Sequence, residues 1–551
     1  MGRAPQKSGF GFLGPWRISC PASGDKRPET LIYDYNHHCI MSPQNDANAL
    51  SCDFRGMISR YRDFAQDKII TDLSEPDPHN YPMVVPTKNG NASKLNWAAI
   101  QRFAIDSGYR IDGSKLPLTS IYRFDLNTGY YEPVTEDHMV LYLISHIKAD
   151  TPDFCIPSNF PTLVSLNIPP VLPDVRTLTG TSDEFDSVRG YYDTQNLIPF
   201  KNGIYSINAN ALLPRTSFIF IEHPLNVDFN PEALADPICE RYMDIMCQRP
   251  DLFELLFEQI GYTLYARDFI VPTITIFYGA GANGKSIVLD VVKRIVGANN
   301  TSALSMYDMI NAFSLAQSEG KLVNISSDSS AGPGDSIIAT ANIAEFLKKA
   351  SSGEEFAFNP KHGKIHNGYG PRKFLFASNV MLKFGDLDGG LARRIYTLPF
   401  DASFQENNTV KASFFTKNAI EWFAMQALIS MCQMIYRAMG NIMFSTDRYS
   451  GEYISCEPAG DMKVEQMTTS DTVLDWLNED MGVDILNVDE VRRTLLGVPN
   501  LWECYKAYCG ESCRQWKTRK SFQSMLKARY KLGFRRTTNT FGHCYVAIDE
   551  E

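Results

Sequence analysis

A glycine-rich segment between residues 279 and 286 carries the residue types that hold the phosphates of a nucleotide. It matches the pattern G-x-x-x-x-G-K-[ST] at every fixed position. In such a loop the glycines let backbone N–H groups point at a phosphate without Cβ clashes. Lys285 places a positive charge on the β- and γ-phosphates, and the Ser286 hydroxyl can ligate Mg²⁺. We therefore expect ATP and Mg²⁺ to bind at Gly279, Ala280, Gly281, Ala282, Asn283, Gly284, Lys285 and Ser286.

Three further polar positions follow at the ends of short apolar runs. Asp328 ends one run. A carboxylate there can polarise water, or it can hold the metal together with Ser286. The alternative is a solvated acid at the end of a strand. Asn379 ends the next, where an amide can bond the γ-phosphate or the attacking water. Arg393 and Arg394 precede a third run, and a guanidinium matches a developing phosphoryl charge.

The elements that must position these residues are readable from the apolar pattern. Ile274–Tyr278 predicts a buried strand before the loop, and apolar residues at helical spacing after it predict a helix. The glycine-rich loop is thus expected between a strand and a helix, and the N-terminus of a helix favours a bound anion. A chance match in a glycine-rich turn would lack this context.

The other segments predict a chain of several domains. Ile121–Phe124 and Gly129–Val134 read as two strands, and Asn202-Gly203 as a hairpin turn. Residues 237–265 have helical periodicity, and Ala419–Met439 reads as a core helix because polar residues interrupt it. We predict a multidomain α/β protein with boundaries at 1–110 (role unknown), 111–235 (α+β), 236–440 (ATPase core with helices) and 441–551 (linker and DNA-binding module).

Composition and charge restrict the class of protein. The chain has 551 residues, 44% apolar and 21% charged, which excludes wholesale disorder, collagen and coiled coil. It has no apolar run long enough to span a membrane, and its first residues show no signal-peptide core. Its twelve cysteines lack metal-site spacing. These features predict a soluble protein of the cytoplasm, or of the host cytoplasm for a mobile element, with no membrane partner.

The net charge of −10 hides a basic segment. Residues 501–540 hold ten lysines and arginines against two glutamates, a net charge of +8. Thr518 can cap a helix there, and residues 534–546 read as a two-stranded wing. Helix, wing and charge fit a winged helix on duplex DNA, with a solvated basic face as the alternative. The DNA-binding candidates in this segment are Lys517, Arg519, Lys520, Arg535 and Arg536.

The order of these motifs resembles the superfamily 3 replicative helicases, and most closely their phage/plasmid and poxvirus-type primase-helicase branch. The loop there reads Gly-x-Gly-x-Asn-Gly-Lys-Ser, as here, and Lys321–Asp328 is similar to the second motif of that branch. Leu347–Glu354 is similar to its Lys-Lys-x-x-x-Gly-Asp segment, with Glu replacing Asp. Leu501–Tyr508 resembles the opening of its winged helix. The resemblance covers roughly residues 115–551 and implies a P-loop AAA+ core.

The resemblance also implies how the protein works. It implies a homo-hexameric ring with ATP between neighbours, which moves 3′ to 5′ on one strand of forked DNA. Lys285, Ser286 and Asp328 would act within one subunit, Asn379 would sense the γ-phosphate, and Arg394, with Arg393 in reserve, would complete the neighbour's site. Residues 356–366 read as a hairpin, which the resemblance places in the ring channel; the alternative is a solvated turn. Its DNA contacts would be Lys361, His362 and Lys364.

The favoured interpretation is therefore an ATP-dependent replicative DNA helicase of a phage, virus or mobile element, with a primase or other replisome proteins as possible partners. One alternative is a P-loop ATPase that packages DNA or remodels protein. Another is an origin-binding initiator whose ATP site controls assembly alone. DNA-stimulated ATP hydrolysis would distinguish the helicase from the packaging or remodelling ATPase. Tight sequence-specific duplex binding with negligible turnover would indicate the origin-binding initiator.

Overall fold

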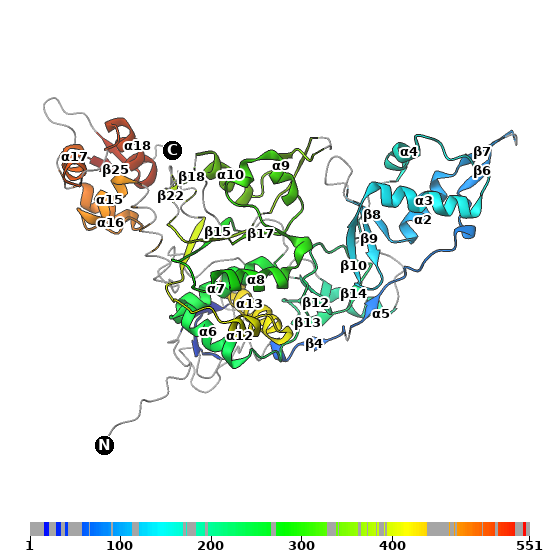
Figure 1. Cartoon of the computed structure of the whole chain (residues 1–551), viewed down its shortest axis with the longest axis horizontal. Helices are drawn as coiled ribbons and strands as arrows, with labels where there is room; N and C mark the ends of the chain where they lie inside the picture. Colours follow the sequence, from blue (N-terminus) through cyan, green and yellow to red (C-terminus); the bar gives the residue numbers. More distant parts are fainter. Residues whose placement is uncertain are drawn as a thin grey trace, which may run out of the picture.

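The computed structural model has a mixed α/β fold with several sheets (Figure 1). It describes most of residues 58–437 and 471–534, together with strands β1 (Trp16–Cys20), β2 (Glu29–Asp34), β3 (Cys39–Met41) and β25 (Cys544–Val546). Gaps in those ranges fall at 113–120, 169–171, 174–182, 193–196, 266–270, 328–337, 362–364, 385–390 and 513–515, and at a few shorter places. Within the described part, no helix combines the length and apolar character that a membrane crossing requires.

A five-stranded parallel sheet forms the centre of the molecule, in the order β16-β17-β21-β15-β23. Most of its residues are buried, as expected when both faces of a parallel sheet are covered. The predicted strand before the glycine-rich loop is confirmed and becomes the second strand from one edge. The strands are β15 (Thr273–Tyr278), β16 (Thr301–Ser302), β17 (Val323–Ser326), β21 (Lys373–Ser378) and β23 (Ile395–Pro399).

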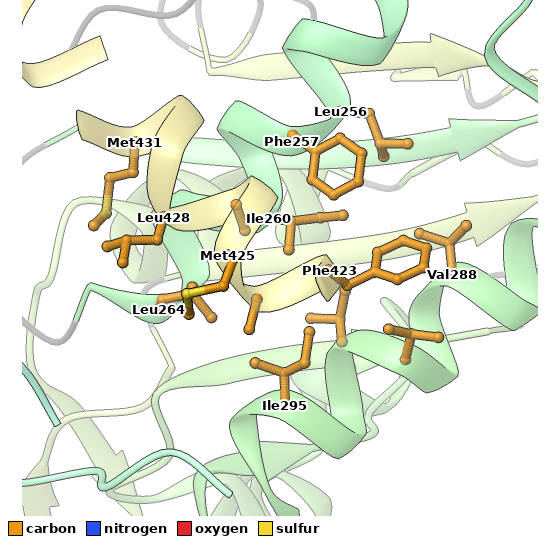
Figure 2. Close-up of a cluster of buried hydrophobic side chains, with 14 of the residues drawn as sticks. Leu256, Phe257, Ile260, Leu264, Val288, Ile295, Phe423, Met425, Leu428 and Met431 are labelled. Carbon is orange, nitrogen blue, oxygen red and sulfur yellow. The ribbon is translucent and has the colours of Figure 1, made fainter. Parts of the chain in front are cut away.

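One face of this sheet is covered by α7 (Pro250–Leu264), α8 (Lys285–Val296) and α13 (Lys417–Arg437). Figure 2 shows side chains of these three helices meeting in one cluster, with Phe257 of α7, Val288 of α8 and Phe423 of α13 among them. The core helix predicted at Ala419–Met439 is confirmed as α13 as far as Arg437, and residues 438–439 lie outside the described part of the chain. The opposite face is covered by α10 (Ala341–Ser351) and the short helix η4 (Asp308–Ile310), and α9 (Ala312–Leu315) packs beside η4.

The helical stretch expected over residues 237–265 is present as two helices, α6 (Pro237–Cys247) and α7. Asp236 caps α6 by accepting a hydrogen bond from the Ile238 amide. The break falls at Gln248, whose φ of 54° ends the helix, and Pro250 then begins α7. Periodicity shows the apolar face but not this break.

Both hairpins predicted ahead of the ATPase segment are present. β9 (Ile121–Asp125) pairs with β10 (Tyr130–Val134), and β11 (Leu197–Phe200) pairs with β12 (Gly203–Ser206). The second loop consists of Lys201 and Asn202, so Gly203 already belongs to the strand. The further strands are β4 (Arg62–Asp63), β5 (Ile69–Ile70), β6 (Val84–Pro86), β7 (Ser93–Leu95), β8 (Tyr109–Ile111), β13 (Ala211–Leu213) and β14 (Arg215–Thr216).

The N-terminal segments pair with strands from later in the chain. β8 pairs with β9 across the expected boundary at residues 110 and 111, and β4 pairs in parallel with β13. Figure 1 shows α2, α3 and α4 forming a lobe with β6 and β7 at one end of the molecule. The helices of this region are α2 (Trp97–Asp106), α3 (Glu136–Asp150), α4 (Phe160–Asn167) and α5 (Asp183–Val188).

The C-terminal module has a hydrophobic core of its own, with Trp476 and Phe522 fully buried in it. Thr518 caps its last helix by accepting a hydrogen bond from the Ser521 amide, as predicted. β24 (Leu532–Phe534) pairs antiparallel with β25, where the two-stranded wing was expected. The helices of the module are α15 (Thr472–Glu479), α16 (Val488–Leu496), α17 (Leu501–Glu511) and α18 (Arg519–Tyr530).

Candidate nucleotide-binding site

The glycine-rich loop leaves the central sheet at the carboxyl edge of β15. In the parallel registers Tyr278 lies opposite Ser378 of β21 and Pro399 of β23, and Ser326 of β17 lies opposite Phe376. The segments that follow these strands therefore emerge at one edge. In open α/β sheets this is the edge at which ligands bind.

The loop backbone is held tightly at both ends. The Gly279 amide donates to the Ser378 carbonyl at 3.2 Å. A Cβ on Gly279 would lie 2.1 Å from Nδ2 of Asn283, and one on Gly284 would lie 2.1 Å from Sδ of Met246. A side chain at either position would therefore require the loop or its neighbours to move.

Lys285 is almost completely buried, with 4% of its surface exposed. Its Nζ donates 2.7 Å hydrogen bonds to the Gly279 carbonyl and to Oδ1 of Asn283. The Asn283 amide in turn donates to the Phe400 carbonyl at 2.8 Å. Burial lowers the pKa of Lys285 to about 8. A phosphate beside Nζ would favour the charged ammonium and raise that pKa.

The first turn of α8 faces the same loop. Gly284 is the N-cap residue and offers no side chain to the amides that follow it, so these donors can serve an anion. Ser286 is exposed in this turn. Its hydroxyl fits a Mg²⁺ ion that takes its remaining ligands from phosphates and water, which is the usual environment of this ion. Among the residues that the structure describes, no cluster of His, Cys, Asp and Glu forms a separate metal site.

Of the two polar positions predicted at strand ends, the structure describes Asn379 but not Asp328. Asp328 lies outside the described residues, directly after Ser327, which is exposed at the end of β17. Asn379 is exposed directly after Ser378, whose carbonyl accepts the hydrogen bond from Gly279. The Asn379 segment and the start of the loop are thus direct neighbours at the carboxyl edge.

Arg394 lies at the other edge of the sheet. Its carbonyl accepts a 2.7 Å hydrogen bond from the Ile274 amide, at the start of β15. From Arg394 the chain runs along β23 to Pro399, a distance of about 17 Å at roughly 3.3 Å per residue. Nη2 of Arg394 donates to Oγ of Ser352 at 2.8 Å, just after α10. Arg394 is thus separated from its own loop by the length of the strand, and Arg393 lies outside the described residues.

The predicted hairpin between the acid-ended strand and β21 is present. β19 (Phe356–Phe358) pairs antiparallel with β20 (His366–Gly368), and Lys361 is exposed near the tip. His362 and Lys364 lie outside the described residues. At the end of the pairing nearest the turn, where His366 lies opposite Phe358, Nε2 of His366 lies 2.7 Å from Oε1 of Glu319. Sequence reasoning missed this pair, because no local pattern connects residues 47 positions apart.

The basic C-terminal residues have different surroundings. Lys517 forms an ion pair with Asp471, with Nζ 2.5 Å from Oδ2. Lys520 is exposed and Arg519 half-buried in the first turn of α18. Arg535 and Arg536 lie outside the described residues. Of the five predicted DNA contacts in this module, Lys520 is therefore the described side chain with the most open position.

Comparisons with known proteins assign no activity to the chain. Residues 277–394 match a family described only as a family of unknown function, DUF5906. No curated protein matches the chain. The apo structure of the NrS-1 C terminal region (305-718) aligns with a TM-score of 0.42 and 12% identity, covering 81% of this chain and 98% of that chain. The A form apo structure of that region gives 0.40 and 11% identity with the same coverage. Similarity at this level carries no argument about function.

Proposed function

We propose that the chain is an ATP-dependent DNA helicase with a P-loop AAA+ core, which works as a ring in the replication of a phage, virus or mobile element. The observation that carries the proposal is the arrangement around Lys285. A buried lysine, an uncapped helix N-terminus and two polar strand ends meet at the carboxyl edge of a parallel sheet. This arrangement suits the β- and γ-phosphates of ATP.

The position of Arg394 supports a site that is shared between subunits. It lies at the edge of the sheet opposite its own loop, so it serves catalysis best at the loop of a neighbouring subunit. An arginine brought in by another protein or subunit stabilises the charge that develops during phosphoryl transfer. Mg²⁺, held through Ser286 and expected at Asp328, would neutralise charge on the phosphates when bound.

Two features support DNA as the polymer along which the protein moves. The hairpin β19–β20 carries the exposed Lys361, and the C-terminal module carries Lys520 on the first turn of a helix followed by a two-stranded sheet. Helices of this kind enter a DNA groove, and lysines beside them contact phosphates. The separate core of the module lets it bind duplex DNA while the central sheet carries the nucleotide.

Strand displacement on forked DNA tests the proposal. The wild-type chain should separate a fork that has a 3′ single-stranded tail, and it should require ATP and Mg²⁺. Lys285→Ala should abolish separation. Lys293→Ala is the matched control, because Lys293 lies in the last turn of the same helix and pairs with Asp290 at 3.7 Å, away from the loop. A chain that hydrolyses ATP but separates no fork would contradict the helicase assignment.

A further inference from the structure

Trp516 is a large aromatic side chain that the C-terminal module leaves in solvent. It is 49% exposed, whereas Trp476 of the same module is fully buried and Trp502 is half-buried. An aromatic side chain stabilises a fold mainly through the apolar surface that it buries. The exposed half of this indole therefore contributes little to the fold and is open to a ligand.

The chain directly after Trp516 is held in place by three contacts. The Lys517 amide donates a 3.0 Å hydrogen bond to the hydroxyl of Tyr505, which is fully buried in the core of the module. The Lys517 ammonium forms the ion pair with Asp471, and Thr518 caps α18. The exposed indole is therefore attached to a fixed support, which lowers the conformational entropy that binding would cost.

Two cations lie near the indole. Nζ of Lys506 is 5.9 Å from the centroid of the Trp516 ring, and the same Nζ is 3.4 Å from Oε2 of Glu503. Lys520 is exposed four residues after Trp516, so their Cα atoms are no more than about 14 Å apart. An exposed aromatic ring beside cations is the combination that holds single-stranded nucleic acid, because bases stack on the ring and phosphates contact the cations.

The helix proposed to contact duplex DNA begins just after Trp516. It starts at Arg519, and Lys520 lies in its first turn. A strand whose phosphates contact Lys520 therefore has neighbouring nucleotides within reach of Trp516. Bases inside a duplex are stacked on one another and offer no free face to an indole, whereas an unpaired base does. The indole can thus distinguish a fork from an uninterrupted duplex.

We propose that Trp516 stacks on an unpaired base at the junction between single-stranded and double-stranded DNA, while Lys506 and Lys520 contact the adjacent phosphates. The C-terminal module thereby recognises the fork itself and not duplex DNA in general. This inference rests on the proposed function, since it takes DNA as the polymer that the protein binds. It requires neither ATP hydrolysis nor assembly of several copies, so the two proposals can be tested separately.

Fluorescence anisotropy with the full-length chain tests the preference for a fork over a blunt duplex. Trp516→Ala should weaken fork binding about tenfold, a typical loss for one stacked base, and should leave duplex binding unchanged. Trp516→Phe should keep most of the fork affinity, because a phenyl ring also stacks. Leu496→Ala is the control, since Leu496 is 38% exposed on α16 of the same module. It should bind both DNAs like the wild type.

Photo-crosslinking of the wild-type chain locates the contact without a substitution. A fork with 5-iodouracil at the first unpaired position should crosslink to Trp516, which mass spectrometry of the peptides identifies. Crosslinks only at other residues overturn the inference, and so does a Trp516→Ala variant that keeps its fork affinity or loses fork and duplex affinity equally. Unchanged fork affinity would leave the indole as a contact for another protein.

The outcome for the proposed function is read separately. A wild-type chain that prefers forks through Trp516 but hydrolyses no ATP contradicts the helicase and supports this inference. A wild-type chain that hydrolyses ATP and separates forks, with no difference between Trp516→Ala and wild type in fork binding, supports the helicase and overturns this inference. A folded wild-type chain that binds no DNA overturns both.

Discussion

The Asn283 side chain connects Lys285 to the strand end beside the loop. Its Oδ1 accepts the 2.7 Å hydrogen bond from Nζ of Lys285, while its Nδ2 donates to the Phe400 carbonyl at 2.8 Å. Both side chains are buried. Asn283 therefore orients the lysine within the loop and fixes the loop to the segment that follows β23.

Replacing Asn283 by Ala should weaken both the loop and the fold around it. The Phe400 carbonyl would lose a buried partner, and a buried group left unsatisfied costs about 1–3 kcal/mol. We expect a lower melting temperature without nucleotide and a higher KM for ATP. Differential scanning fluorimetry and steady-state hydrolysis measure the two effects. Asn127→Ala, at an exposed turn, is the control and should change neither. An unchanged KM in Asn283→Ala would show that the amide does not organise the loop.

The pKa of Lys285 predicts how ATP binding depends on pH. Burial lowers this pKa to about 8, and phosphates beside Nζ would raise it. Binding should therefore take up protons above pH 8, and affinity should fall as the pH rises through that value. Titration calorimetry in two buffers of different ionisation enthalpy measures the uptake. Lys285→Ala should lose this pH dependence, and a wild-type affinity that is flat from pH 7 to 9.5 would be the contrary result.

The lowered pKa of Lys285 also makes the stability of the nucleotide-free protein depend on pH, in the direction opposite to that of ATP affinity. An unfolded lysine titrates near 10.5, so between pH 8 and that value the unfolded chain binds more protons than the folded chain. The contribution of Lys285 to stability therefore improves as the pH rises through this window. Melting temperatures of wild type and Lys285→Ala, compared across it, should show the wild type gaining relative to the variant.

The separation of Arg394 from its own loop predicts complementation between variants. Arg394→Ala and Lys285→Ala should each be inactive alone. When the two are mixed equally, about one interface in four pairs an intact loop with an intact arginine. Partial recovery of ATP hydrolysis should follow, and it can be measured after subunit exchange has been verified by mass spectrometry. No recovery in exchanged assemblies would indicate that Arg394 acts within its own subunit or only supports the fold through Ser352.

The different surroundings of Lys517 and Lys520 predict different roles. Lys520→Ala should weaken duplex binding and reduce the salt slope of the log affinity by about one. Lys517→Ala should mainly lower the melting temperature of the module, because Asp471 loses its 2.5 Å partner. Fluorescence anisotropy over a series of salt concentrations and thermal denaturation distinguish the two. Equal salt slopes for Lys520→Ala and wild type would mean that Lys520 is only solvated.

The sequence predicted those parts of the site that are contiguous in the chain. The loop, the strand before it, the helix after it and the core helix α13 follow from apolar periodicity and a fixed motif. The partners that constrain the loop could not be predicted, because Met246 and Phe400 reach it only through the packing of α6 and the parallel pairing of β15 with β23. The helix break at Gln248 was missed for a related reason, since a local φ change leaves the apolar period on either side intact.

The most direct test of the central claim is the rate of ATP hydrolysis by the full-length chain, with and without single-stranded DNA, for wild type, Lys285→Ala and Lys293→Ala. The account predicts hydrolysis that requires Mg²⁺ and is stimulated by DNA in the wild type and in Lys293→Ala. It predicts loss of turnover in Lys285→Ala, with the melting temperature of the empty protein close to that of the wild type. Turnover near the wild-type rate in Lys285→Ala, or a folded wild-type chain that neither binds nor hydrolyses ATP, would contradict it.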